Sequence, residues 1–183
     1  QDGFLNNKES VYKQLQGKTL SFNNMLDINA GLELIKEFEE PSVAVIKHTN
    51  PSGVASGLTI QEAYKRANGA DAKSAFGSIV ALNRNCNYET AKIIEQLFIE
   101  VVLCPKFDDD ALEILKKKKN LRLIETTPVG IKKNQQNKKE EEMYKAYELK
   151  SVGWGILLQD NYFPEVTENN IKIVTKKELT KKE

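Results

Sequence analysis

Residues 43–53 read VAVIKHTNPSG, an apolar run that stops at a Lys-His pair and a polar segment containing Pro and Gly. The apolar run predicts a buried strand over residues 43–46, and the turn-forming residues after it predict where it ends. Lys47 and His48, the only histidine of the chain, then stand at the carboxyl end of a strand. Open α/β sheets hold their ligand crevices at such ends, so we expect a site here.

The Lys-His pair has a chemical use if its two side chains share one site. Neighbours in a regular strand point to opposite faces, so sharing requires the strand to end near Ile46. A cation beside an imidazole disfavours the imidazolium, so His48 would stay neutral and accept a proton. Lys47 would face an anion or a developing oxyanion. For a lone dipeptide, a solvated lysine beside a satisfied polar histidine is the commoner interpretation, and it stays open at this point.

The rest of the chain alternates apolar runs with apolar residues at helical spacing. Helices are expected over residues 28–38, 60–68, 88–98 and 109–119, and further strands over 78–82, 101–103 and 121–124. Asp27, Thr59 and Asn87 are the expected N-caps, and Gly69 is expected to end the second helix. This alternation predicts an α/β layered domain with a mainly parallel core.

The last third of the chain has a different composition. Residues 132–142 are almost all polar or charged and predict an exposed loop or a solvated hairpin. A strand is expected to end near residue 152, followed by a glycine turn and a buried strand over 153–160. We therefore divide the chain into a domain over residues 1–165 and a charged tail or linker over residues 166–183.

Composition narrows the classes of function. The 27 basic and 26 acidic residues give a net charge of +1, which argues against bulk affinity for nucleic acid. Two cysteines, Cys86 and Cys104, and one histidine are too few for a typical structural zinc site. Nothing demands a disulfide, and no apolar run suits a membrane span, so we expect a cytoplasmic protein. Because the first residue is Gln, we also expect a piece of a longer chain.

Five segments, in this order along residues 4–160, resemble the AICAR formyltransferase/IMP cyclohydrolase family. They are LSFNNMLD at 20–27, KHTNPSGVA at 47–55, SAFGSIVALNR at 74–84, EVVLCP at 100–105 and ALEILKKKKNLR at 111–122. The resemblance implies a layered αβα, cytidine-deaminase-like domain with a mixed, mainly parallel sheet. It implies transfer of a formyl group from 10-formyltetrahydrofolate to the exocyclic amine of aminoimidazole carboxamide ribonucleotide (AICAR), without a metal, in purine (IMP) biosynthesis.

The resemblance also implies roles for individual residues. His48 would be the base that deprotonates the amine, and Lys47 would stabilise the tetrahedral intermediate. Substrate-binding positions are implied for Asn23, Asn24, Asn50, Gly77 and Glu100. Each of these has a structural alternative: cap or turn chemistry for the two neighbouring asparagines, support of the Lys-His loop for Asn50, a turn for Gly77, and a solvated helix-end charge for Glu100.

Family members form homodimers whose active sites are shared across the interface, and the parent protein would also be an IMP cyclohydrolase. The family's phosphate-binding segment, its second deaminase-like half and its cyclohydrolase domain would lie outside these 183 residues. We therefore expect the chain alone to be inactive. The main competing interpretation is a non-catalytic nucleotide-binding or scaffolding α/β module. A zinc deaminase is disfavoured, because Cys86 and Cys104 do not reproduce the Pro-Cys-x-x-Cys element of those enzymes.

Overall fold

The computed structural model describes residues 12–126, residues 147–160 and the single positions 172, 174 and 176. The chain divides into two compact units, residues 1–131 and 132–183, which we describe separately. The expected loop over 132–142, the expected boundary at 165 and most of the expected tail lie outside the described residues.

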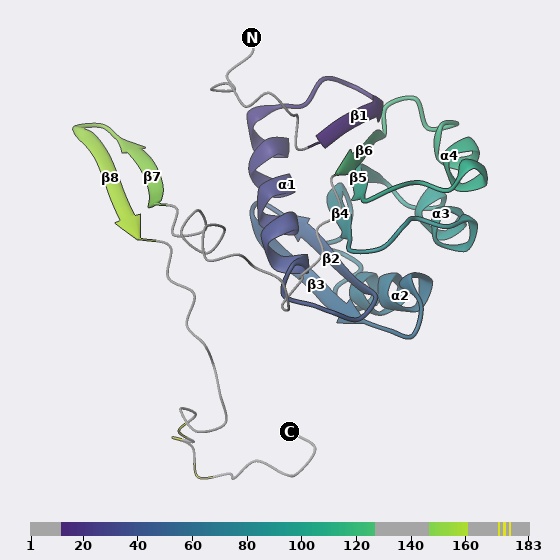
Figure 1. The fold of residues 1–183 in the computed structure, drawn as a ribbon, viewed down its shortest axis with the longest axis horizontal. Helices are drawn as coiled ribbons and strands as arrows, with labels where there is room; N and C mark the ends of the chain where they lie inside the picture. The colour runs from purple at the N-terminus through teal and green to yellow at the C-terminus, as the bar shows by residue number, and fades with distance from the viewer. Residues whose placement is uncertain (1–11, 127–146, 161–171, 173, 175, 177–183) are drawn as a thin grey trace, which may run out of the picture. The chain divides into compact units, whose positions relative to one another are not determined.

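The first unit is built on a six-stranded sheet with the order β1-β6-β5-β4-β2-β3 (Figure 1). The strands are β1 (Tyr12–Gln16), β2 (Ser42–Lys47), β3 (Asn50–Ser56), β4 (Ser78–Leu82), β5 (Ile99–Cys104) and β6 (Arg122–Thr126). Strands β4, β5 and β6 are parallel, β2 runs antiparallel to both β4 and β3, and β1 runs antiparallel to β6. Four of the six strands therefore share one direction, which confirms the predicted mixed, mainly parallel sheet.

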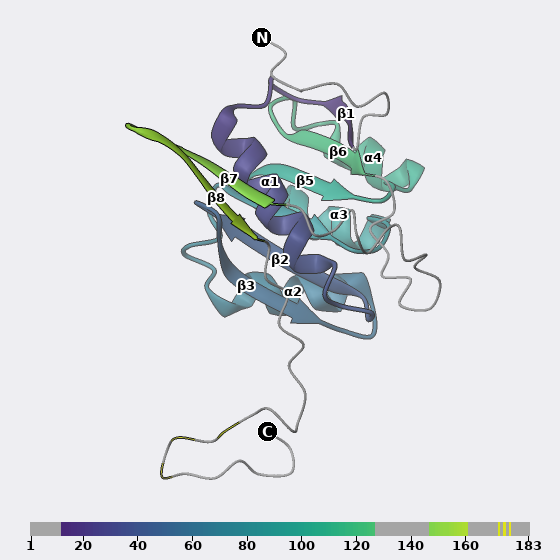
Figure 2. The same ribbon diagram turned by 60° about the vertical axis from the view of Figure 1, so that its left-hand side comes forward.

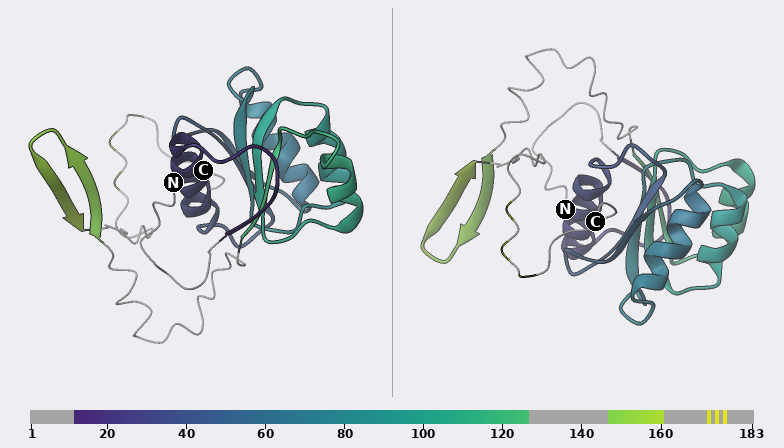
Figure 3. Two further views of the ribbon diagram at one scale, coloured as in Figure 1. Left: turned by 90° about the horizontal axis from the view of Figure 1, so that it is seen from above. Right: turned by 90° about the horizontal axis from the view of Figure 1, so that it is seen from below.

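Helices cover both faces of this sheet. Helix α1 (Phe22–Ile35) lies on one face, and α2 (Ile60–Ala70), α3 (Tyr88–Glu95) and α4 (Asp109–Leu115) lie on the other (Figure 3). Strand β2 shows why helices must cover both faces of the sheet, since its apolar side chains point to both faces and all of them are buried. Val43 and Val45 pack in the core under α2, α3 and α4, whereas Ala44 and Ile46 pack in the core under α1. The layered αβα prediction is confirmed.

Three of the four described helices, α1, α2 and α3, begin after a residue whose side chain accepts a backbone N–H of the first turn. Thr59 and Asn87 accept hydrogen bonds from backbone N–H groups in the first turns of α2 and α3, as predicted. The expected start of α1 after Asp27 is wrong, because Ser21 caps the helix more than one turn earlier. The Ser21 hydroxyl accepts the Asn24 N–H, and the Asn24 side chain accepts the Ser21 N–H, both at 3.1 Å.

Several strand and helix boundaries differ from the sequence prediction. Helices α1 and α3 each end three residues before the expected end, at Ile35 and Glu95. The sequence predicts a turn at residues 50–53, but these residues begin strand β3. Pro51 has no backbone N–H to donate, and a proline is tolerated here because β3 is an edge strand of the sheet. Helix α2 continues through Gly69 to Ala70, and α4 ends at Leu115, before the lysine run. Strand β1 was not predicted, because Tyr12–Gln16 is too polar to show a buried pattern.

The second unit contains a two-stranded antiparallel hairpin, β7 (Tyr147–Val152) and β8 (Gly155–Asp160), drawn in light green in Figure 2. The two strands were predicted, but the expectation that residues 153–160 are buried is wrong. Trp154 is 91% exposed, and Ile156, Leu157 and Leu158 are all more than half exposed. Within the described residues, no helix has the length and apolar character needed to cross a membrane.

Candidate functional site: a strained hairpin carrying Lys47 and His48

His48 and Thr49 form the two-residue turn between β2 and β3. Lys47 pairs with Asn50 across the hairpin, and both turn residues have positive φ, 53° for His48 and 62° for Thr49. This is the pattern of a type I′ turn, which is usually built from Asn-Gly because left-handed backbone suits those residues. A β-branched threonine in this region is a genuine outlier, and such a conformation costs about 1–3 kcal/mol. The surrounding structure must therefore hold this turn in place.

Three hydrogen bonds hold the turn. Asp27 Oδ1, from helix α1, accepts the Thr49 backbone N–H at 2.6 Å. The Asn50 amide and the Thr49 hydroxyl both donate to the His48 carbonyl, at 2.8 and 2.7 Å. Asn50, predicted as a substrate-binding residue, therefore has its amide engaged in supporting the turn.

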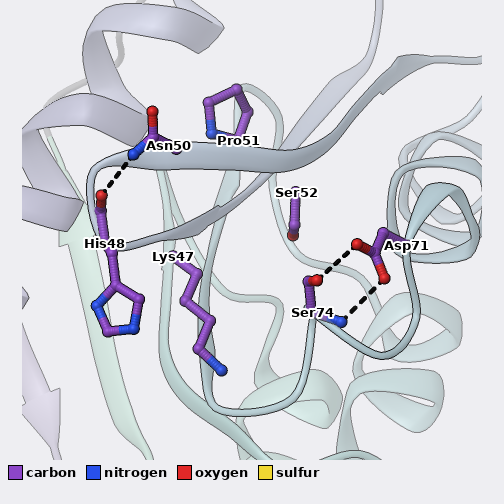
Figure 4. Close-up of a pocket in the computed structure, with 7 residues that line it drawn as sticks. All are labelled: Lys47, His48, Asn50, Pro51, Ser52, Asp71 and Ser74. Carbon is purple, nitrogen blue, oxygen red and sulfur yellow. Dashed lines mark hydrogen bonds between the residues drawn. The ribbon is translucent and has the colours of Figure 1, made fainter.

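Lys47 and His48 line the same open pocket, which has a volume of about 320 Å³ (Figure 4). The other lining residues are Asn50, Pro51, Ser52, Asp71 and Ser74. The two side chains share this pocket although β2 extends through Lys47, so the expected strand end near Ile46 is wrong. Neighbouring side chains point to opposite faces only within a regular strand, and this alternation ends at Lys47 because His48 already has the left-handed backbone of the turn.

The two side chains differ in how firmly they are held. Lys47 is half-buried, and its ammonium group donates to the Phe76 carbonyl at 2.6 Å. His48 is exposed, and no hydrogen bond from residues 12–126 or 147–160 reaches its ring. The pair thus combines an anchored cation with an imidazole whose nitrogens are open to a ligand.

Asp71 and Ser74 form the wall of the pocket opposite the hairpin turn (Figure 4). The Ser74 hydroxyl and backbone N–H both donate to the Asp71 carboxylate, at 2.5 and 3.0 Å. These hydrogen bonds lower the pKa of Asp71, the contact with the hydroxyl having the larger effect. Both residues precede β4, and neither was singled out from the sequence.

The hairpin turn lies at one end of the strands of the sheet. Because β2 is antiparallel to β4, with Ile46 opposite Ile79, the carboxyl end of β2 meets the beginning of β4. The parallel strands β5 and β6 also begin at this end. The Lys-His pair therefore lies at the carboxyl end of its own strand, as predicted, and at this end of the sheet the parallel strands β4, β5 and β6 begin.

Asn24 in the first turn of α1 and Glu100 at the beginning of β5 are further predicted site residues at this end of the sheet. Asn24 Nδ2 donates to Glu100 Oε2 at 3.2 Å, and Arg122 Nη1 lies 3.6 Å from the same oxygen. Asn24 is buried, and the Arg122 side chain is only 12% exposed, whereas that of Glu100 is 42% exposed. Asn23, next to Asn24, is exposed. Arg122 was not predicted as part of this group.

Gly77 supports the beginning of β4. Its φ of 71° is left-handed, its N–H donates to the Phe98 carbonyl at 2.8 Å, and a Cβ there would lie 3.4 Å from the Phe98 ring. The rings of Phe76 and Phe98 are 4.8 Å apart, and both side chains are more than half exposed. The turn alone accounts for a glycine at this position.

A family model described as the AICARFT/IMPCHase bienzyme matches residues 2–183. The chain belongs to the AICARFT/IMPCHase bienzyme family. Relatives include the bifunctional purine biosynthesis protein PurH of Thermoanaerobacter sp. (strain X514) and that of Shouchella clausii (strain KSM-K16), each 46% identical over 171 residues. These alignments cover 93% of this chain but only 31% of each relative, so the chain spans about a third of the length of those proteins.

Among solved structures, the apo dCMP deaminase from the cyanophage S-TIM5 is similar at 14% identity and a TM-score of 0.41. The likeness covers 55% of this chain and 94% of that chain.

In this member of the AICARFT/IMPCHase bienzyme family, no group of three or more His, Cys, Asp or Glu residues among those described could hold a metal. Cys86 and Cys104 are free and buried. Burial raises the pKa of the Cys86 thiol to about 12 and also raises that of Cys104. Both thiols are therefore protonated at neutral pH, which suits core packing rather than metal ligation or nucleophilic chemistry.

Proposed function

We propose that this chain forms the Lys-His part of an AICAR formyltransferase, which transfers a formyl group from 10-formyltetrahydrofolate to the AICAR amine in purine (IMP) biosynthesis. The observation that carries the proposal is the pocket shared by Lys47 and His48 in a chain of this family. An anchored cation beside an open imidazole suits acyl transfer to a weakly basic amine, which needs both a base and stabilisation of developing negative charge.

In this mechanism, the amine nitrogen attacks the formyl carbon while His48 removes the amine proton. Lys47 stabilises the negative charge that develops on the formyl oxygen of the tetrahedral intermediate. The bond between the formyl carbon and the folate nitrogen then breaks, and the proton passes to the departing nitrogen. The hydrogen bond from Lys47 to the Phe76 carbonyl fixes the ammonium group before the substrates arrive, so little reorganisation is needed during the reaction.

The nucleotide would bind at the same end of the sheet. Glu100 Oε2 accepts a hydrogen bond from Asn24 and forms an ion pair with Arg122. No hydrogen bond from the described residues reaches the other carboxylate oxygen, Oε1. That second oxygen is suited to accept a hydrogen bond from the substrate. We include Asn23, Asn50 and Gly77 as neighbouring positions that would contact it, although the structure already engages the Asn50 amide and the Gly77 N–H.

We propose that the remaining parts of the enzyme belong to a longer chain, because the relatives are about three times as long as the aligned segment. In that protein, a second half would supply the folate-facing residues, and a further domain would have IMP cyclohydrolase activity. The protein would be a cytoplasmic homodimer with active sites shared between the subunits. This chain alone would therefore not transfer a formyl group.

The test compares formyl transfer and AICAR binding in the full-length protein and its His48→Ala variant. General-base assistance is typically worth about 10²–10⁴-fold, so we expect kcat to fall by that factor while AICAR binding is retained. Tight AICAR binding with an unchanged kcat would contradict the proposal. The complementary measurement is made on the 183-residue chain, in which any measurable formyl transfer would contradict the division of the active site.

A further inference from the structure

The turn that carries His48 adopts a conformation that its own sequence disfavours. Both central residues have positive φ, yet neither is a glycine, and Thr49 is β-branched. An isolated hairpin with this sequence would spend much of its time in other turn geometries. Because the His48 side chain leaves the backbone inside this turn, its position depends on whatever holds the turn.

Most contacts that stabilise the turn are local. The Asn50 amide and the Thr49 hydroxyl both donate to the His48 carbonyl, and these groups belong to the hairpin itself. They fix the shape of the turn but not its position relative to the rest of the protein. Lys47 is tied to the Phe76 carbonyl, but that bond acts on a side chain at the end of β2.

Asp27 supplies the contact that comes from another element. Its Oδ1 lies 2.6 Å from the Thr49 backbone nitrogen, 22 residues away along the chain. Among the described residues, no other hydrogen bond connects the backbone of the turn with a helix. A carboxylate that accepts a backbone N–H makes a charge-assisted hydrogen bond, which is stronger than a neutral one.

The carboxylate is itself held in a fixed position. Asp27 lies in the second turn of α1, whose start is fixed by the Ser21–Asn24 capping box. The next residue, Ile28, is 3% exposed and packs in the core beneath the helix. The helix therefore presents Oδ1 to the turn as a rigid acceptor.

We propose that Asp27 is a positioning residue for His48, clamping the strained turn so that the imidazole is held over the pocket. This inference rests on the proposed function, in which His48 is the base. Asp27 does not contact the substrate. Its carboxylate acts through the Thr49 N–H, and it keeps both turn residues in the left-handed region without a glycine.

The test uses the full-length protein with Asp27→Ala, Asp27→Asn and the double variant Asp27→Ala/Thr49→Gly. A displacement of about 1 Å at a catalytic group can cost about 10²-fold, so we expect Asp27→Ala to lower kcat by about 10- to 100-fold. The KM for AICAR should change little. Asp27→Asn keeps an oxygen acceptor and should retain most of the activity. Thr49→Gly should restore part of the loss, since glycine adopts positive φ freely.

Hydrogen exchange of the Thr49 amide reports the clamp independently of activity. We expect Asp27→Ala to speed this exchange while the melting temperature stays close to that of Glu33→Ala, a control on the exposed side of the same helix. Unchanged kcat and unchanged Thr49 exchange in Asp27→Ala would overturn the inference. So would a loss in Asp27→Asn as large as that in Asp27→Ala.

The His48→Ala variant separates this inference from the proposed function. Full activity of His48→Ala overturns the proposed function, and with it any role for Asp27 in placing a base. Loss of activity in His48→Ala together with full activity in Asp27→Ala overturns only the role of Asp27. If Asp27→Ala does not fold, the double variant Asp27→Ala/Thr49→Gly is compared with Thr49→Gly alone by the same two readouts. A lower kcat and faster exchange of the residue 49 amide in the double variant support the inference, and equal values of both overturn it.

Discussion

Gly53 lets the hairpin that carries Lys47 and His48 pack directly against helix α2, and its replacement by alanine tests that packing. A Cβ at position 53 would lie 1.9 Å from the Ala67 carbonyl oxygen, which belongs to the helix backbone. Strand and helix would have to separate by at least 1.1 Å (3.0 − 1.9) to reach the closest contact that real Cβ atoms make. Overpacking of this kind costs about 1–3 kcal/mol, and a backbone obstacle favours the upper end.

We therefore expect Gly53→Ala to lower the free energy of unfolding by about 3 kcal/mol, about a 150-fold change in the unfolding equilibrium at 1.4 kcal/mol per factor of ten. The assay is urea denaturation followed by far-UV circular dichroism, because the one tryptophan of the chain, Trp154, is not part of the first unit. Gly69→Ala is the matched control within α2, since nothing lies within 4 Å of a Cβ there. It should stabilise the protein by about 0.5–1 kcal/mol. Equal effects of the two substitutions would refute the packing argument.

Three further predictions concern other parts of the first unit. Burial raises the pKa of Cys86 from 9.0 to about 12, so the protonated thiol stabilises the folded state fully below pH 9. The free energy of unfolding should fall between pH 9 and 12 in wild type and less steeply in Cys86→Ala, which keeps the buried Cys104 thiol with its own raised pKa. Equal slopes in the two proteins would contradict this cause. Asn87→Ala removes the cap that accepts the Thr90 N–H and should cost about 1 kcal/mol in urea denaturation, whereas Asn87→Asp should cost much less. Glu100→Ala leaves the largely buried Arg122 without its carboxylate and should weaken AICAR binding measured by calorimetry, and unchanged affinity would remove Glu100 from the proposed site.

Local signals in the sequence predicted the layers of the fold. The apolar run of β2 and the spacing of Ile28 and Ile35 identified buried surfaces, because burial imposes the period of the element on its apolar residues. Thr59 and Asn87 were recognisable as caps, because a short polar side chain before an apolar helix satisfies free N–H groups. These features depend on residues that are close in the sequence.

The direction of β2 and the partners of the site residues could not be predicted in the same way. Whether β2 runs parallel or antiparallel to β4 depends on chain topology, and the antiparallel direction places the Lys-His turn at the end of the sheet where β4 begins. Asp27 was interpreted as a helix cap, but its partner is 22 residues away. The contact between Asn24 and Glu100 joins residues 76 positions apart. The Pro and Gly of the segment after His48 masked strand β3, because both residues usually mark turns.

Chemical rescue of the His48→Ala variant tests directly whether the His48 imidazole is the base that deprotonates the amine. In the full-length His48→Ala protein, formyl transfer would be measured with increasing concentrations of imidazole and of substituted imidazoles of different pKa. The vacated position opens onto a pocket of about 320 Å³, so the added base can reach the amine. We predict a rate that rises with imidazole concentration and depends on the pKa of the added base. Undiminished turnover of His48→Ala without imidazole would contradict the role of His48 as the base. The same conclusion would follow if turnover were lost and no added base restored it although AICAR still bound.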